Sequence, residues 1–323
     1  MAERGDWKNE TWIIRHEGAR LEVAARGATV VSWRVATPAG PRELIDGYRD
    51  DAELEAGHGA RSAVMAPWSN RIHDARYAFA DQHYDLGPAA DGSREAIHGL
   101  VSDQDFTLTE ATDNSLTLAT SVAPQVGYPF PVTVAVTYRL AVGPRGGQRL
   151  EAHLVTTNVG TRRAPVGIGW HPYVQLGNVD ELRVAIPARA RVAVDDALIP
   201  LLGDDAYVPT ALPVELAPIG EAIIDTAYTD LVADADGLVR SLLVGPDGAS
   251  VTLEQRTATQ RRGQGIVHIF TGDTLQVRRR QSLAIEPCQF VTNAFNRAET
   301  GRAVALAPGH SAVLDAALVY RGA

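Results

Sequence analysis

The amino-acid sequence predicts an all-β protein, built as a large antiparallel sandwich or barrel. Short stretches rich in Val, Thr, Ile, Leu and Tyr recur along the chain, and Gly, Pro, Asp and Asn separate them. Many of these stretches alternate apolar and polar residues, as half-buried strands do. Helical periodicity is scarce, since the segment 86–100 has room for a turn or two of helix at most.

The predicted strands recur along the whole chain, with long loops between some of them. They lie within residues 12–35, 105–122, 132–142, 149–158, 182–194, 239–256 and 310–321. The sequences TDNS (112–115) and GPDGAS (245–250) fall where hairpin turns are expected. Neither an internal repeat nor a low-complexity linker divides the chain, so residues 1–323 are predicted to form a single domain.

Charge and composition exclude several classes of function. The net charge is −9, and most basic residues are scattered. We expect the clusters Arg261-Arg262 and Arg278-Arg279-Arg280 at solvated strand or loop ends. A protein that binds nucleic acid needs a basic face, so no nucleic-acid partner is expected. The sole lysine, Lys8, lies in the polar N-terminal segment, which argues against Schiff-base and P-loop chemistry.

The sequence also predicts a cytoplasmic protein that does not enter a membrane. No apolar run reaches the length of about 18 residues that a spanning helix requires. The N-terminal residues MAERGDWKNETW have no apolar signal core. Cys288 is the only cysteine, so the chain has neither an internal disulfide nor a multi-cysteine metal site.

Four short stretches combine ionisable residues with residues that interrupt sheets. They contain Asn70, Arg71 and His73 in APWSNRIHDARYAF, His98 in AIHGL, His171 in GIGWHPY and Glu286 in AIEPCQF. A proline lacks the N–H that a ladder needs, so His171-Pro172 and Glu286-Pro287 are each predicted to mark a strand end. A carboxylate and an imidazole held on opposite sides of a substrate act as general base and general acid.

An ordered set of motifs resembles the aldose 1-epimerase (galactose mutarotase) family. The set consists of MAPWSNRI (65–72), YAFADQHYDL (77–86), IHGL (97–100), YPFPVTVAVTYRL (128–140), APVGIGWHPY (164–173), IDTAYTDL (224–231), IEP (285–287) with NAFN (293–296), and LAPGHSAVL (306–314). The resemblance implies a galactose mutarotase-like supersandwich, a large antiparallel β-sandwich with a sugar cleft. It also implies interconversion of the α and β anomers of a free aldose, such as glucose or galactose, without a cofactor.

The resemblance assigns roles to individual residues. Glu286 matches the general base and His171 the general acid, while Asn70, Arg71, His98 and Asp225 match residues that bind sugar hydroxyls. Strand alternation places Trp170 in the core and makes Tyr173 the better candidate for a sugar contact. No metal site is expected, because the nine histidines include no closely spaced H-x-H pair.

Two other functions remain open at this point. A glycoside hydrolase would use Glu286 and Asp225 as its two carboxylates, although His171 would then have no natural role. A non-catalytic sugar-binding module would use the same cleft without acid/base chemistry. The sequence names neither the sugar nor its phosphorylation state, and it leaves a monomer and a homodimer equally possible.

Overall fold

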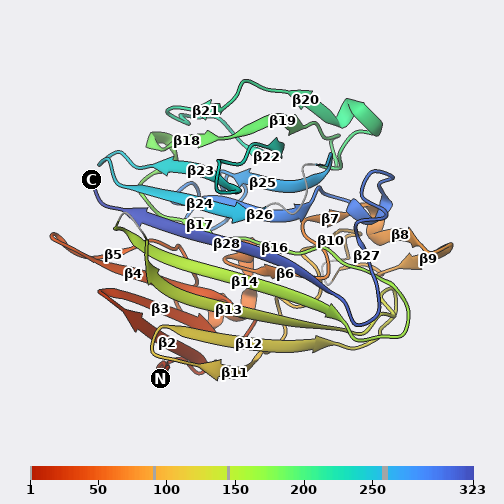
Figure 1. Cartoon of the computed structure of the whole chain (residues 1–323), viewed down its shortest axis with the longest axis horizontal. Helices are drawn as coiled ribbons and strands as arrows, with labels where there is room; N and C mark the ends of the chain where they lie inside the picture. Colours follow the sequence, from red (N-terminus) through yellow and green to blue (C-terminus); the bar gives the residue numbers. More distant parts are fainter. Residues whose placement is uncertain (1, 90–91, 144–145, 257–260) are drawn as a thin grey trace.

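Two large antiparallel sheets form the body of the protein, which confirms the predicted β-sandwich (Figure 1). The structure is a computed structural model that describes residues 2–89, 92–143, 146–256 and 261–323. The inward faces of both sheets contribute to one hydrophobic cluster, which includes Val136, Leu154 and Leu318 from one sheet and Val267 and Ile285 from the other.

The nine-stranded sheet crosses Figure 1 from β11 at the bottom to β21 at the top. In spatial order its strands are β11 (Thr107–Ala111), β12 (Ser115–Val122), β13 (Val132–Val142), β14 (Gln148–Asn158), β28 (Ser311–Arg321), β24 (Ser250–Arg256), β23 (Leu238–Val244), β18 (Arg183–Ile186) and β21 (Val214–Leu216). Along β13 every second residue from Val132 to Leu140 is buried, as the alternating sequence predicted.

The second sheet has eight strands and lies against the first. Its strands are β20 (Tyr207–Pro209), β19 (Ala188–Val192), β22 (Asp225–Leu231), β25 (Gln264–Phe270), β26 (Leu283–Phe290), β16 (Gly169–Trp170) and β6 (Val64–Met65), with β17 (Tyr173–Val174) also paired to β26. The first six residues of β26 are buried on both faces. One face of this strand packs into the core, so other segments of the chain must cover the opposite face.

A five-stranded N-terminal sheet extends the same core. It is formed by β1 (Glu3–Arg4), β2 (Thr11–His16), β3 (Ala19–Ala24), β4 (Val30–Thr37) and β5 (Gly40–Glu43). Leu21 and Trp33 of this sheet are fully buried in the shared cluster. The Tyr138 hydroxyl of β13 donates a hydrogen bond to the Ala28 carbonyl at 3.0 Å, which ties the two sheets together.

The remaining elements are short. Three strand pairs join β7 (Arg71–Ile72) to β10 (Ala96–Ile97), β8 (Arg76–Phe79) to β9 (Gln82–Asp85) and β15 (Ala164–Pro165) to β27 (Ala305–Leu306). The helical elements are α1 (Asp51–Ala56), η1 (His58–Ala60), η2 (His73–Ala75), η3 (Val179–Glu181), η4 (Gly203–Ala206) and η5 (Ala294–Asn296). Asp50 caps α1 by accepting a hydrogen bond from the Glu53 amide at 2.9 Å, and Gly57 ends the helix with a φ of 63°.

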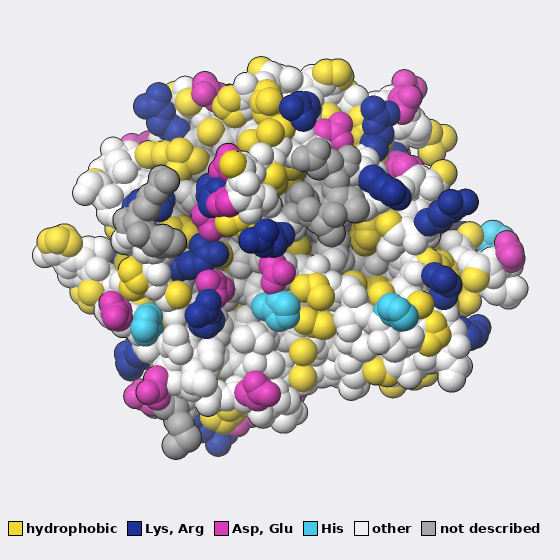
Figure 2. Space-filling model, viewed as in Figure 1, with side chains coloured by type: hydrophobic (Ala, Val, Ile, Leu, Met, Phe, Trp, Pro, Cys, Tyr) yellow, Lys and Arg dark blue, Asp and Glu magenta, His cyan; other side chains and the backbone are white. Residues whose placement is uncertain are grey.

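The visible surface mixes basic and acidic side chains (Figure 2). Several arginines on the nine-stranded sheet are paired, for example Arg149 and Arg240, whose guanidinium groups both contact Glu254. Among the described residues, no helix is both long and apolar enough to cross a membrane. The assignment of residues 1–323 to a single domain stays a prediction.

Candidate functional site

A cleft of about 630 Å³ opens on the outer face of the eight-stranded sheet. Its wall includes the seven residues for which a catalytic or binding role was predicted, namely Asn70, Arg71, His98, His171, Tyr173, Asp225 and Glu286. His73, named with them in the sequence, is exposed and does not line the cleft. The period of two in a strand explains this convergence. Ile285 and Trp170 point into the core, and the residues that follow them, Glu286 and His171, therefore point into the cleft.

Glu286 and His171 form the floor of the cleft. The Nε2 atom of His171 lies 3.3 Å from Oε1 of Glu286, and their side chains are only 6% and 3% exposed. The other carboxylate oxygen, Oε2, is buried and has no hydrogen-bond partner within the described part of the chain. A buried polar atom without a partner is costly, so Oε2 is an acceptor that a polar ligand would satisfy.

The structure corrects the prediction that Glu286-Pro287 ends a strand, because β26 continues to Phe290. The Ile285 amide donates to the Pro172 carbonyl and the Gln289 amide donates to the Ile168 carbonyl. By this spacing, an N–H at position 287 would face Trp170. Proline is tolerated inside β26 because the neighbouring ladder is interrupted at that point.

At His171-Pro172 the predicted strand end is a short interruption. Pairing with β26 stops for these two residues and then resumes. Gly169 pairs with Cys288, and Tyr173 pairs with Ala284 in the same register. The strands β16 and β17 are thus two parts of one interrupted strand. The interruption leaves His171 beside Glu286, fixed by backbone hydrogen bonds to Ala63 and Ser62.

His268 is a cleft residue that the sequence analysis missed. It lies on β25 directly opposite Glu286 of β26, with its Nε2 atom 2.6 Å from Oδ1 of Asp225. Burial disfavours a charged imidazole, but the Glu286 and Asp225 carboxylates outweigh it and raise the pKa of His268. Burial alone would raise the pKa of Asp225, whereas the hydrogen bond with His268 holds that pKa below its ordinary value.

The paired strands β7 and β10 bring Asn70, Arg71 and His98 to one side of the cleft. The Asn70 Oδ1 atom accepts a hydrogen bond from Arg71 Nη1 at 3.2 Å, and the His98 amide donates to the Asn70 carbonyl. Arg71 Nε lies 3.7 Å from the Glu95 carboxylate. His98 Nδ1 is buried without a hydrogen-bond partner in the described chain, so a polar ligand in the cleft could satisfy it.

The three cleft histidines differ in their preferred protonation. The His98 ring meets the His171 ring edge to face, with centroids 5.2 Å apart. Burial lowers the pKa of His98 well below 6.5, and the nearby His171 adds to this effect. Burial also lowers the pKa of His171, although the Glu286 carboxylate opposes it. His268 is therefore the histidine of this site most strongly favoured as a cation.

Tyr173 lies behind His171 and is fully buried. Its ring stacks on the His171 ring at a centroid distance of 5.0 Å, and its hydroxyl donates to the Gly59 carbonyl at 2.9 Å. The Arg61 guanidinium lies 5.0 Å from the centre of the same ring. This geometry makes Tyr173 a support for His171 more than a surface for the sugar.

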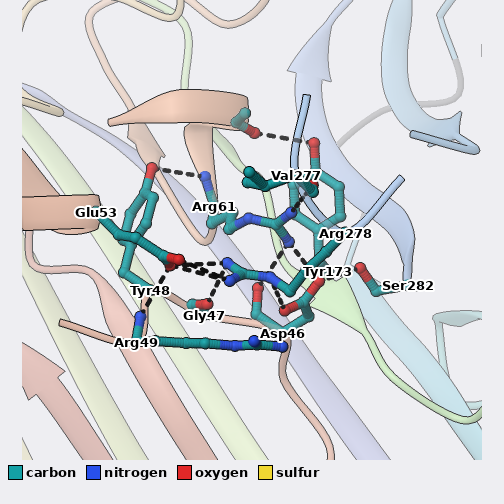
Figure 3. A network of polar contacts seen from close by, with 11 residues as sticks. Asp46, Gly47, Tyr48, Arg49, Glu53, Arg61, Tyr173, Val277, Arg278 and Ser282 are labelled. Carbon is teal, nitrogen blue, oxygen red and sulfur yellow. Dashed lines mark hydrogen bonds and ion pairs between the residues drawn. The ribbon is translucent and has the colours of Figure 1, made fainter. Parts of the chain in front are cut away.

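A buried network of charges holds this support in place (Figure 3). Asp46 receives Arg61 Nη1 at 2.5 Å and Arg278 Nε at 2.9 Å, and its backbone amide donates to the Tyr173 carbonyl. Arg278 also contacts Glu53 of α1 at 3.0 Å. The two arginines and two carboxylates balance in charge, as buried ions require.

This network overturns the prediction that Arg278-Arg279-Arg280 is a solvated end. The Arg278 side chain is 6% exposed and the Arg280 side chain 14%, whereas that of Arg279 is 63% exposed. The alternating arginines anchor the segment 274–277, which lines the cleft. Arg61 Nη2 donates to the Val277 carbonyl at 3.3 Å and joins that segment to η1. Arg261 and Arg262 are both exposed, as the sequence predicted.

The chain also matches a known protein family. Residues 10–316 match the model of the family described as aldose 1-epimerase. This chain belongs to the aldose 1-epimerase family. Within the described residues, no group of three or more His, Cys, Asp or Glu side chains is arranged to hold a metal ion.

Related proteins agree with the family match. The chain is 32% identical to the uncharacterized protein YihR of Escherichia coli (strain K12) over 236 residues, which cover 72% of this chain and 71% of YihR. A GalM/aldose epimerase homologue from C. elegans has the same fold, with a TM-score of 0.79 and 17% identity over 99% of both chains. Galactose 1-epimerase from Lactobacillus acidophilus gives 0.77 and 14% identity, covering 100% of this chain and 98% of the other.

Proposed function

We propose that the protein is an aldose 1-epimerase, or mutarotase, that interconverts the α and β anomers of a free aldose. The observation that carries this proposal is the contact between His171 Nε2 and Glu286 Oε1, 3.3 Å apart on the cleft floor. A base and an acid that lie side by side can act on the two oxygens of a cyclic hemiacetal, the functional group of a ring-closed aldose. Its anomeric hydroxyl oxygen, O1, and its ring oxygen, O5, are bonded to the same carbon.

The reaction balances without any further group. Glu286 removes the proton from O1, the C1–O1 bond becomes a carbonyl, the C1–O5 bond breaks, and His171 protonates O5. Rotation about C1–C2 presents the other face of the aldehyde. Ring closure then returns the proton from O5 to His171 and the proton of Glu286 to O1. Both side chains end in their starting states, so no cofactor is required.

The adjacent geometry changes one expectation from the sequence. A carboxylate and an imidazole on opposite sides of the sugar were expected, yet the two side chains are neighbours on the same sheet face. Because O1 and O5 share a carbon, neighbouring groups reach both oxygens without movement of the backbone. Placement on paired strands supplies the orientation that proton transfer needs.

The other cleft residues are assigned to binding. Arg71 offers donors to two neighbouring hydroxyl oxygens, and Asn70 orients its guanidinium group. The Asp225 carboxylate accepts hydrogen bonds from the remaining sugar hydroxyls, and His98 Nδ1 exchanges a hydrogen bond with one of them. Tyr173 acts through His171 and does not contact the sugar.

Optical rotation tests the proposal and separates it from the two alternatives. Freshly dissolved α-D-glucose or α-D-galactose should equilibrate faster with the protein than in buffer. Release of reducing sugar from a glycoside, with no faster equilibration, would favour hydrolysis by Glu286 and Asp225. Sugar binding with neither activity would favour a non-catalytic binding module and would refute the proposed reaction.

A further inference from the structure

His268 has no part in the reaction as described so far, although it lies at the reacting centre. It pairs with Glu286 across the β25–β26 ladder, which places the two side chains next to each other on the same face. Its imidazole is buried and lies 2.6 Å from the Asp225 carboxylate. A histidine held in this way cannot change its side-chain orientation at the cleft wall without breaking its contact with Asp225.

The charged and titratable groups that face His268 come from every neighbouring element. They are Asp225 on β22, Glu286 on β26, His171 between β16 and β17, Arg71 on β7 and His98 after β10. Two carboxylates attract a positive charge on His268, and one of them is in hydrogen-bond contact. These contacts outweigh the burial of the ring and raise the pKa of His268.

We propose that His268, held by Asp225, is a positioning residue that places a fixed positive charge on the cleft floor and so sets the pH range in which the Glu286–His171 pair is active. This inference rests on the proposed epimerase reaction. It assigns to His268 a role that neither the acid nor the base performs, since His268 exchanges no proton with the sugar.

The physical effect acts on His171, the proposed acid. A positive charge on His268 disfavours a second positive charge on His171, and it contributes to the lowered pKa of that residue. Because His171 can protonate O5 only in its charged form, this contribution lowers the pH above which the reaction slows.

His268→Gln tests this role through the pH profile of kcat/KM. Glutamine keeps a hydrogen-bond donor for Asp225 but carries no charge. The alkaline limb of the profile, which reports His171, should move to higher pH by about one unit. A merely structural role would lower kcat/KM by the same factor at every pH and leave the alkaline limb in place, which would overturn the proposal.

His153 provides the matched control. It forms a second His–Asp pair, with Nδ1 2.6 Å from Asp315 Oδ1, on the exposed face of the nine-stranded sheet. The side chains of this pair are 49% and 51% exposed. His153→Gln should leave both the size and the position of the pH profile unchanged. A shift in this variant equal to that of His268→Gln would contradict a local effect at the cleft.

A second measurement does not depend on catalysis. In protein labelled with ¹³C and ¹⁵N at histidine, the titration midpoint of His268 should lie above the ordinary histidine value of 6.5, whereas that of His98 should lie well below it. Asp225→Asn should lower the titration midpoint of His268, even if His268→Gln fails to fold. A midpoint for His268 at or below 6.5 would overturn the inference. A different result would refute the epimerase reaction itself: His268 is charged, but the wild-type protein accelerates the anomer exchange of no aldose. The charge on His268 would then have no catalytic use.

Discussion

His171 Nε2 lies 3.3 Å from Glu286 Oε1, on two strands whose ladder is interrupted by a proline on each side. Pro172 and Pro287 both lack the N–H that would close this part of the sheet. The interruption leaves the two ionisable side chains buried, adjacent and turned toward the cleft. Residues that weaken the ladder thus create the place where the proposed proton transfers occur.

Replacing His171 by asparagine should lower kcat by about a hundredfold to ten-thousandfold, the contribution typical of one general acid. Asparagine keeps a polar group beside Glu286 but cannot carry a proton to O5. Polarimetry at saturating sugar measures kcat, and circular dichroism checks the fold.

Tyr173→Phe removes only the hydrogen bond to the Gly59 carbonyl. It should cost about 1 kcal/mol of stability and much less activity.

The alkaline limb of kcat/KM should lie below the ordinary histidine pKa of 6.5. Burial lowers the pKa of His171 in the free protein, so the protonated acid is fully present only at pH values below that lowered pKa. Activity should therefore fall as pH rises through it. Initial rates at low sugar concentration give this profile, because kcat/KM reports the free enzyme. An alkaline limb above pH 8 would show that another group supplies the proton.

Arg71→Lys should raise KM by about tenfold, in line with the loss of a hydrogen bond to a charged group, and change kcat less. Lysine keeps the charge but loses the planar fork of donors and the geometry that Asn70 holds. Arg76→Lys is the control, since Arg76 pairs with Asp74 and Asp85 away from the cleft. An equal KM in the Arg71 and Arg76 variants would show that Arg71 does not bind the sugar.

Arg278→Met should destabilise the protein by about 3–5 kcal/mol, because it leaves Asp46 and Glu53 with less compensating charge in a buried place. Arg279→Met, one residue later and 63% exposed, should change the free energy of unfolding by less than about 0.5 kcal/mol. Urea unfolding of the two variants gives the comparison. Equal stabilities would mean that the network of Figure 3 is not a structural anchor.

Strand alternation predicted many of the strands, because it is a local property of the sequence. The family resemblance supplied the candidate site residues, and the structure places them around one cleft. Alternation also offered a signal for His268 that was overlooked. In GIVHIF, Val267 and Ile269 face the core, so the histidine between them must face the other way. A single polar residue in an apolar run was too weak a signal without a known partner.

Other features depend on contacts between distant segments. The burial of Arg278 could not be predicted, because its partner Glu53 lies 225 positions away in the chain. The continuation of β26 through Pro287 required knowledge of the matching interruption at Pro172 in the neighbouring strand. In both places a local rule was correct for an isolated segment, and tertiary pairing changed its outcome.

Exchange NMR between sugar anomers, with wild-type protein and Glu286→Gln, tests the account most directly. A panel of free and phosphorylated aldoses identifies the substrate, and Glu110→Gln, at an exposed position on β11, is the control. Wild type and Glu110→Gln should accelerate exchange of at least one aldose, whereas folded Glu286→Gln should match buffer. Full acceleration by Glu286→Gln, or none by wild type on any sugar of the panel, would contradict the account.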